Sequence, residues 1–339
     1  MGEPQQNLRA GVPVESRADF WTAIAWQTIP WLIAIGFFFT AEGYLSLGTQ
    51  VIIWILFTLS LDLALGYAGI ITLGHAAFFG FGAYTAGILA VHTSIDPLLA
   101  FFIATIFAAV LGFLTGILIL HTTGVTLLML TLAVASMLYE FANRNRWLTG
   151  GDDGLQGMNV EPMFGIFEFN IFGETAYVYS LVVLFIWYLV ARRLVKSPFG
   201  RSLDGIRQNP RRMRAIGTPV WWRLVAIYTI SAAMAGSAGA LQAHATRFVG
   251  LPVLSLLTSG IVAVMLVVGG TKRIYGAFVG AAFYYVLQDV SSKINPHLSE
   301  MIIGVLLICV VLFLEGGLMS VFDMARAGWA RWRGSGRKP

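Results

Sequence analysis

Seven ionisable side chains lie inside or near long apolar runs, where they could carry protons or bind a polar ligand: Asp62, His75, His121, Glu140, His244, Asp289 and Glu315. A charge at the centre of a bilayer costs about 2.5–3.5 kcal/mol, so these residues should face a bundle interior, a cavity or the membrane interface. Glu140 and Glu315 lie near the ends of their runs. Asp62 and Asp289 are then the central acids, too few for a proton relay. We expect helix-to-helix hydrogen bonds for most of the seven, with His75 as the exception.

His75 is set apart by the glycine-rich stretch around it. Between Gly66 and Tyr84, glycines occupy positions 66, 69, 74, 80 and 82. Glycine weakens regular helix, and it lets two backbones approach closely or a helix break inside the protein. A broken segment could line a transport pathway, because its free backbone groups and helix ends would face a cavity. Small-residue packing alone is an equally open interpretation of the spacing.

A second glycine-rich element runs from Thr149 to Gly157 and contains Asp152 and Asp153. It lies in the linker 143–176, which holds five acids and two arginines. On the outer face of a membrane, such a turn would suit docking of a substrate-binding protein. A solvated loop that merely connects two helices is the alternative.

The linker from Arg192 to Arg223 has the opposite charge, with nine basic residues and a single acid, Asp204. Basic loops stay on the cytoplasmic side, so this linker is predicted to be cytoplasmic. Asn209 followed by Pro210 is typical of a helix start, and a glycine such as Gly217 of a helix end. The pattern therefore predicts two short helices joined by an elbow.

Apolar residues in this elbow require a partner surface. Leu203 and Ile206 share one helix face, as do Met213 and Ile216. They could insert into a groove of another protein, whereas a basic loop held against anionic lipid would use the arginines alone. Some arginines could contact the partner protein while others contact anionic lipid.

The elements that must position these residues are membrane helices. Of 339 residues, 57% are hydrophobic and 12% charged, against about 25% charged in a soluble domain. A helix needs about 20 apolar residues to cross the hydrocarbon core, where unpaired backbone groups are too costly for other structures. We therefore predict an all-α polytopic helical bundle of about ten membrane segments, some of them discontinuous, with a cytoplasmic coupling elbow. The segments are 20–40, 48–66, 72–92, 98–120, 122–142, 177–195, 223–243, 253–271, 274–292 and 299–319.

Charge also divides the chain into regions. A polar N-terminal tail, 1–19, precedes the transmembrane domain, 20–320, and a basic tail, 321–339, follows it. The domain includes an external loop, 143–176, and a cytoplasmic loop, 192–222. Six segments precede the cytoplasmic loop and four follow it, so both termini are predicted to be cytoplasmic.

Other classes of chemistry are not supported by the sequence. Five scattered histidines and Cys309 show no metal-ligand spacing, and no Gly-x-x-x-x-Gly-Lys-Ser/Thr phosphate loop occurs. We expect no enzyme activity, no metal and no cofactor in this chain. The net charge of +5 comes from residues that flank membrane segments, so no nucleic-acid partner is expected.

Three stretches of the sequence together carry a family resemblance. They are Leu61–Ala86, with Gly-Tyr-Ala-Gly at 66–69 and Leu-Gly-His-Ala-Ala-Phe-Phe-Gly at 73–80, then 149–157, then Lys196–Gly217. They resemble the LivM-type permeases of branched-chain amino acid importers, over residues 40–320. Thr72 stands where that family more often has serine, and Asp62 where it has Asn or Asp. The match at 268–277 is partial, because Lys272 replaces a usual glycine and residues 257–263 lack an expected Arg or Glu.

The resemblance implies a permease subunit that moves leucine, isoleucine or valine across the inner membrane by alternating access. The implied partners are two ABC ATPases, which would bind ATP and magnesium, a second homologous permease, a periplasmic amino-acid-binding protein and membrane lipid. A permease for urea or short-chain amides is the close alternative, because such proteins share the glycine motif. An ion-coupled secondary amino-acid transporter would instead depend on Asp62 or Asp289.

The resemblance also assigns candidate roles to residues. Those of the substrate pathway are Asp62, Gly66, Gly69, Thr72, Gly74, His75, Gly80 and Gly82. Those of ATPase coupling are Ser197, Gly200, Arg201, Ile206, Arg207, Asn209, Ala215 and Gly217. Those of binding-protein docking are Gly150, Gly151, Asp152, Asp153 and Gly154.

Overall fold

A computed structural model describes residues 17–40, 42–93, 95–158, 160–162, 173–294, 298–313 and 316–320. Most of both predicted tails, 1–19 and 321–339, and Glu315 lie outside these residues. Two compact units are present, one ending at Glu42 and one beginning at Gly43. The first contains α1 (Arg17–Thr40), a helix with Pro30 in its interior.

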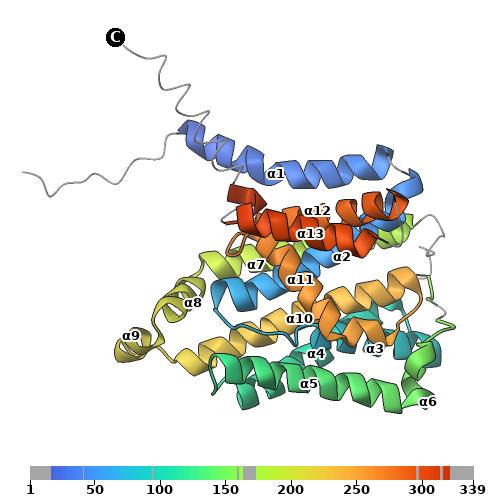
Figure 1. Cartoon of the computed structure of the whole chain (residues 1–339), viewed down its shortest axis with the longest axis horizontal. Helices are drawn as coiled ribbons and strands as arrows, with labels where there is room; N and C mark the ends of the chain where they lie inside the picture. Colours follow the sequence, from blue (N-terminus) through green and yellow to red (C-terminus); the bar gives the residue numbers. More distant parts are fainter. Residues whose placement is uncertain are drawn as a thin grey trace, which may run out of the picture. The chain divides into compact units, whose positions relative to one another are not determined.

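The secondary structure described in the second unit consists of helices, in agreement with the predicted all-α fold class (Figure 1). Over its described residues, the non-helical pairing is limited to one isolated bridge between Leu155 and Val249. The longer helices are α2 (Leu45–Leu61), α3 (Ala76–His92), α4 (Pro97–Ile119), α5 (Val125–Arg144), α7 (Glu174–Lys196), α8 (Pro198–Gln208), α10 (Val220–Thr246), α11 (Leu256–Gly269), α12 (Ile274–Ile294) and α13 (Ser299–Phe313). The short elements are η1 (Glu42–Tyr44), η2 (Asp62–Tyr67), α6 (Arg146–Thr149), η3 (Gly151–Asp153), α9 (Pro210–Ala215) and η4 (Leu251–Leu254).

Helices α2 and α10 form the centre of this unit. In each, 78% of the apolar span is buried, against 22–33% in α4, α5 and α7. Helix α10 packs against α2, α3 and α4, and its middle is built from small buried residues: Ser231, Ala232, Ala235, Gly236, Ser237, Ala238, Gly239 and Ala240. Small side chains let helix backbones approach closely, which compensates for the weak apolar driving force between helices in lipid. The outer helices leave apolar side chains exposed, as lipid-facing helices do.

Five helical stretches in the described residues are long and apolar enough to cross a membrane. A sixth is added if α11 and α12, bent by 116° at their junction, count as one broken span. Six of the predicted segments agree with the observed helices α1, α4, α5, α7, α10 and α12 within three residues at each end. The expected count of about ten is not confirmed.

In two predicted segments, apolar composition continues through a break in the helix. Segment 72–92 becomes helical only at Ala76, and segment 253–271 is divided between η4 and a helix of 14 residues. Pro252 lies in η4, and Gly270, with φ of +104°, ends α11. An apolar window reports composition, not helix length.

Candidate functional site

Helix α2 ends in a π-helical turn where the glycine-rich stretch begins. The turn, η2, is followed by residues 68–75, which are not helical. Gly69 has a φ of +74°, a left-handed conformation that favours glycine and ends the helix. The Ile70 N–H then turns back to donate to the Ala64 carbonyl at 2.9 Å. Of the two interpretations left open for this stretch, a break is thus present at its start.

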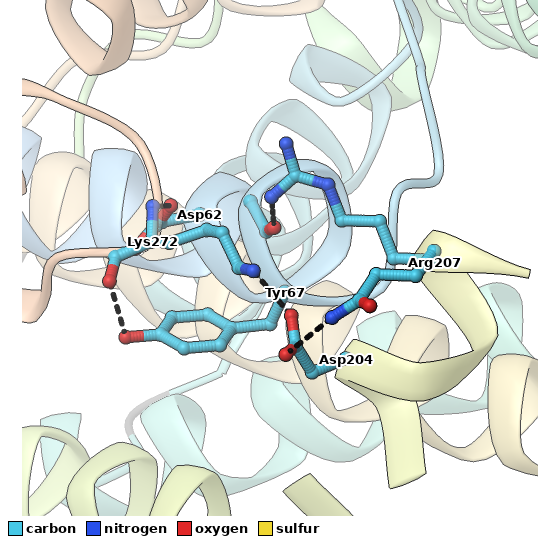
Figure 2. Close-up of polar contacts among 7 residues, drawn as sticks. Asp62, Tyr67, Asp204, Arg207 and Lys272 are labelled. Carbon is cyan, nitrogen blue, oxygen red and sulfur yellow. Dashed lines mark hydrogen bonds and ion pairs between the residues drawn. The ribbon is translucent and has the colours of Figure 1, made fainter. Parts of the chain in front are cut away.

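The acid that opens η2 is tied to a distant turn. Asp62 is fully buried, and its carboxylate accepts a 2.9 Å hydrogen bond from the backbone N–H of Lys272, between α11 and α12. The Tyr67 hydroxyl donates to the Lys272 carbonyl at 3.0 Å (Figure 2). Gly66 leaves room for this carboxylate, since a Cβ there would lie 2.8 Å from Asp62 Cγ.

Helix α8 reaches the same place from the basic linker. The Arg207 guanidinium donates to the Gly66 carbonyl, and the Lys272 ammonium forms an ion pair with Asp204 (Figure 2). A Cβ at Gly69 would lie 2.9 Å from Arg207 Cγ, so the arginine stem passes directly over this glycine. Hydrogen bonding to Lys272 holds the pKa of Asp204 below its ordinary value, so Asp204 is charged at neutral pH.

We call the six residues at this meeting point of η2, α8 and the α11–α12 turn the polar joint: Asp62, Gly66, Tyr67, Asp204, Arg207 and Lys272. It unites two predicted pathway residues, Asp62 and Gly66, with the predicted coupling residue Arg207. The joint therefore connects the basic linker directly to the break in the glycine-rich stretch.

The predicted start of the second short helix in the linker is confirmed. Asn209 caps α9 by accepting from the Arg212 N–H at 3.1 Å, with Pro210 at the first helical position. Beyond α9, Gly217 has a φ of +82°. Ser197 is likewise the cap of α8, accepting from the Gly200 N–H at 3.3 Å.

Burial divides the remaining candidate coupling residues. Gly200 and Ile206 are buried, and Gly200 lies against the last carbonyls of α7, where a Cβ would clash. Arg201, Ala215 and Gly217 are exposed. Ile206 thus anchors α8 to this chain and does not offer its side chain to a partner.

His75 lies in a buried polar layer deeper in the bundle. Its Nε2 is 2.8 Å from the Ser60 hydroxyl on α2, and its ring stacks on Phe57. Ser231 on α10 donates to the Ser60 carbonyl at 2.6 Å. His75, at the start of α3, therefore makes a bond to helix α2 of the kind that we expected of the other ionisable residues. Among the described residues, its Nδ1 has no hydrogen-bond partner.

The other predicted pathway residues serve local geometry and packing. Thr72 closes a tight turn by accepting from the Gly74 N–H at 3.1 Å. A Cβ at Gly74 would clash with the Thr131 backbone, one at Gly80 with Leu254, and one at Gly82 with the Gly236 backbone on α10. For Gly74, Gly80 and Gly82 the close-packing alternative describes what the structure shows.

The second glycine-rich element is a constrained loop. Gly150, Gly151 and Gly154 all have positive φ, at +77°, +58° and +70°. Leu155 pairs with Val249 in both directions, at 2.8 and 3.3 Å, which anchors the loop to the segment after α10. Asp152 and Asp153 stay exposed, and Asp152 lies 3.4 Å from Arg146. In Figure 1, the adjoining α6 lies at the opposite end of this unit from α8 and α9.

Two of the acids in apolar runs are paired within their own helices. Asp289 binds Lys293 at 2.6 Å and Glu140 binds Arg144 at 2.7 Å, both one turn apart. This differs from the helix-to-helix bonds that we expected, because residues four positions apart are neighbours on a helix surface and each acid has a basic residue there.

Sequence reasoning missed three members of the polar joint: Tyr67, Asp204 and Lys272. Two signals were available. Asp204 is the single acid of a strongly basic linker, and Lys272 is a cation at a Gly-Gly break between apolar runs. The sequence does not show that Asp204 and Lys272 lie close together, because 68 positions separate the two residues.

Comparison with known proteins places the chain in a family. Residues 43–311 match the family described as "Branched-chain amino acid transport system / permease component". The high-affinity branched-chain amino acid transport permeases LivM of Salmonella typhimurium and Escherichia coli are 26% and 27% identical over 83% of this chain and 71% of their own length. A probable LivM permease of Methanocaldococcus jannaschii is 25% identical over 81% of this chain and 94% of its length. No solved structure matches. The chain belongs to the family of permease components of branched-chain amino acid transport systems.

Proposed function

We propose that this chain is the transmembrane permease subunit of an ATP-binding cassette importer for leucine, isoleucine and valine. The observation that carries the proposal is the polar joint, in which a capped, basic pair of short helices is bonded to the break in a buried glycine-rich stretch. The names of the LivM relatives support the substrate class.

Mechanical coupling follows from this arrangement. Helix α9 exposes Arg211, Arg212 and Arg214, and the adjoining Ile216 is 73% exposed. Two ATPase subunits, which would hold ATP and magnesium, would bind this surface and pull on it when they close. The Ser197 hydroxyl donates to the Leu194 carbonyl and Gly200 packs against the last carbonyls of α7, so α8 is fixed to the end of α7. Because Arg207 also bonds α8 to Gly66, a pull on α9 reaches the break after α2. The bundle then alternates its access, with substrate passing near residues 66–82.

The further partners occupy other surfaces. A periplasmic amino-acid-binding protein would dock on residues 150–154, whose acids are exposed on a loop held in one shape by left-handed glycines. A second homologous permease and lipid would cover the apolar outer helices. In this arrangement the chain lies in the inner membrane with about ten segments, and both termini are cytoplasmic.

The close alternative is an importer of urea or short-chain amides, and a more distant one is an ion-coupled secondary transporter. Asp289, one of the two acids that ion coupling would use, is paired with Lys293, which disfavours the secondary transporter. Asp62 remains buried and is available to either mechanism.

Uptake of radiolabelled leucine and urea by cells with and without the gene tests the substrate. We expect deletion to remove high-affinity leucine uptake and leave urea uptake unchanged, and restoring the gene to recover it. A defect in urea uptake alone would establish the amide importer in place of the amino-acid importer.

The orientation can be tested with one introduced thiol. Cys309 is exposed and is first replaced by serine, so that it cannot react. In this Cys309→Ser background we expect Gln156→Cys to react with a membrane-impermeant thiol reagent added to spheroplasts, where the outer face of the inner membrane is accessible. Gln156 is itself exposed, next to the proposed docking loop. The matched control, Arg211→Cys on α9, should react only after the membrane is opened. The reverse pattern would invert the proposed topology.

A further inference from the structure

Lys272 lies in the turn between α11 and α12, in a backbone conformation that side chains rarely adopt. Its φ is +63°, in the left-handed region that favours glycine. Gly270, two residues earlier, has a φ of +104°, and the two helix axes differ in direction by 116°. A lysine at this position is held there by its surroundings, because its own backbone preference is against it.

Three bonds hold Lys272, and each comes from another element or end of an element. Asp62, at the start of η2, accepts from its N–H at 2.9 Å. Tyr67, at the end of η2, donates to its carbonyl at 3.0 Å. Asp204 of α8 pairs with its ammonium (Figure 2). The backbone of Lys272 is thus hydrogen-bonded to η2, and its side chain is paired with α8.

The two contacts of α8 therefore reach two different parts of the bundle. Arg207 bonds to Gly66, within η2, and Asp204 bonds to the α11–α12 turn. Asp204 and Arg207 are three positions apart on one helix, so they face the same side. A displacement of α8 moves both contacts together.

We infer that Asp204 and Lys272 are positioning residues that carry motion of α8 to the α11–α12 pair, so that one movement of the basic linker shifts this pair along with the break after α2. The inference rests on the proposed function, and it adds a second route from the ATPases into the membrane.

The ion pair suits a contact that must transmit force and remain adjustable. The side chains of Lys272 and Asp204 are 37% and 40% exposed, so their attraction is partly screened by water. Such a pair contributes little to folding stability, but it restricts the relative positions of the elements that bear it. Its removal should therefore impair coupling more than folding.

The variant Lys272→Gly separates these effects. Glycine adopts a positive φ without strain, so this change removes the ammonium and keeps the turn. The backbone bonds to Asp62 and Tyr67 remain available. Asp204→Asn removes the other charge while keeping the size of the side chain.

The experiment uses the complete complex in proteoliposomes and measures leucine transported per ATP hydrolysed. We expect Lys272→Gly and Asp204→Asn each to lower this ratio about fivefold, the change equivalent to about 1 kcal/mol, at the upper end for a partly exposed pair. The double variant should be no worse than either single one, and ATP hydrolysis and thermal stability should persist. The exchanged pair Asp204→Lys with Lys272→Asp should recover part of the ratio.

Asp289→Asn is the matched control, because it breaks a comparably exposed ion pair that lies within α12 alone. It should leave the ratio unchanged. The inference would be overturned if Lys272→Gly and Asp204→Asn gave the same ratio of leucine to ATP as the control. It would also be overturned if the double variant lowered the ratio about 25-fold, because the two substitutions would then act independently. If one of the two single variants fails to assemble, the ratio of the other single variant is compared with that of the Asp289→Asn control in the same way. Wild-type complex without ATP-dependent transport would overturn the proposed function as well, so the two failures are distinguishable.

Discussion

Adding a single methyl group at Gly82 is expected to lower the thermal stability of the folded chain and its yield. A Cβ at this position would lie 2.5 Å from Gly236 Cα and 2.6 Å from its carbonyl carbon, on the facing side of α10. Backbone atoms cannot rotate away as a side chain would, so α3 and α10 must separate. The expected cost is about 3 kcal/mol, at the upper end for an overpacked core, out of about 5–15 kcal/mol of total stability in a typical protein.

The measurement compares Gly82→Ala with Gly260→Ala by thermal unfolding in detergent and by the yield of monodisperse protein. Gly260 lies in α11, and apart from its own helix backbone no described atom lies within 4 Å of the position that an added Cβ would take, so alanine there meets open space. It should gain about 1 kcal/mol of helix propensity. Equal behaviour of the two variants would show that α3 and α10 do not meet through these glycines.

Replacing Arg207 with glutamate is expected to abolish leucine uptake while the chain still inserts in the membrane. Glutamate cannot donate to the Gly66 carbonyl, and it would place a second acid three positions from Asp204 and close to Asp62. Losing a hydrogen bond to a charged group costs about 1.5–3 kcal/mol, which corresponds to a loss of about tenfold or more in the coupled state. Repulsion between the acids adds to this loss.

Arg193→Glu provides the control for this change of charge. Arg193 is exposed in the last turn of α7, in the same basic linker, and its substitution should change uptake by no more than about twofold. Uptake is normalised to the amount of each variant in the membrane. Normal uptake by Arg207→Glu would remove the polar joint from the transport mechanism.

Local features of the linker could be predicted because their causes lie within a few residues. Asn209 followed by Pro210 favours a helix start, since the asparagine side chain caps a free N–H group and proline fits the first turn. The density of glycine likewise indicated a break after η2 as one of two open interpretations. Both features are present in the structure.

The roles of individual glycines could not be predicted, because they depend on which helix passes nearby. Gly66 and Gly69 make room for Asp62 and Arg207, whereas Gly82 makes room for another backbone. All three have the same sequence signal. The spacing of small residues indicates a close approach without identifying what approaches.

Pairing across the chain was also beyond local patterns. The sequence marks Lys272 as unusual and Asp204 as the lone acid of its linker, but the fold is needed to bring them together. The ends of some membrane helices were misplaced for a related reason, since apolar composition extends beyond the start of α3 at Ala76 and through η4 before α11.

The most direct test of the central claim is leucine uptake by proteoliposomes that contain the chain, its proposed second permease and the two ATPases, with the binding protein added. We predict accumulation of leucine that requires ATP and disappears when the phosphate-loop lysine of the ATPases is replaced. Accumulation that survives this replacement and collapses with the proton gradient would contradict the account, because the chain would then be an ion-coupled transporter.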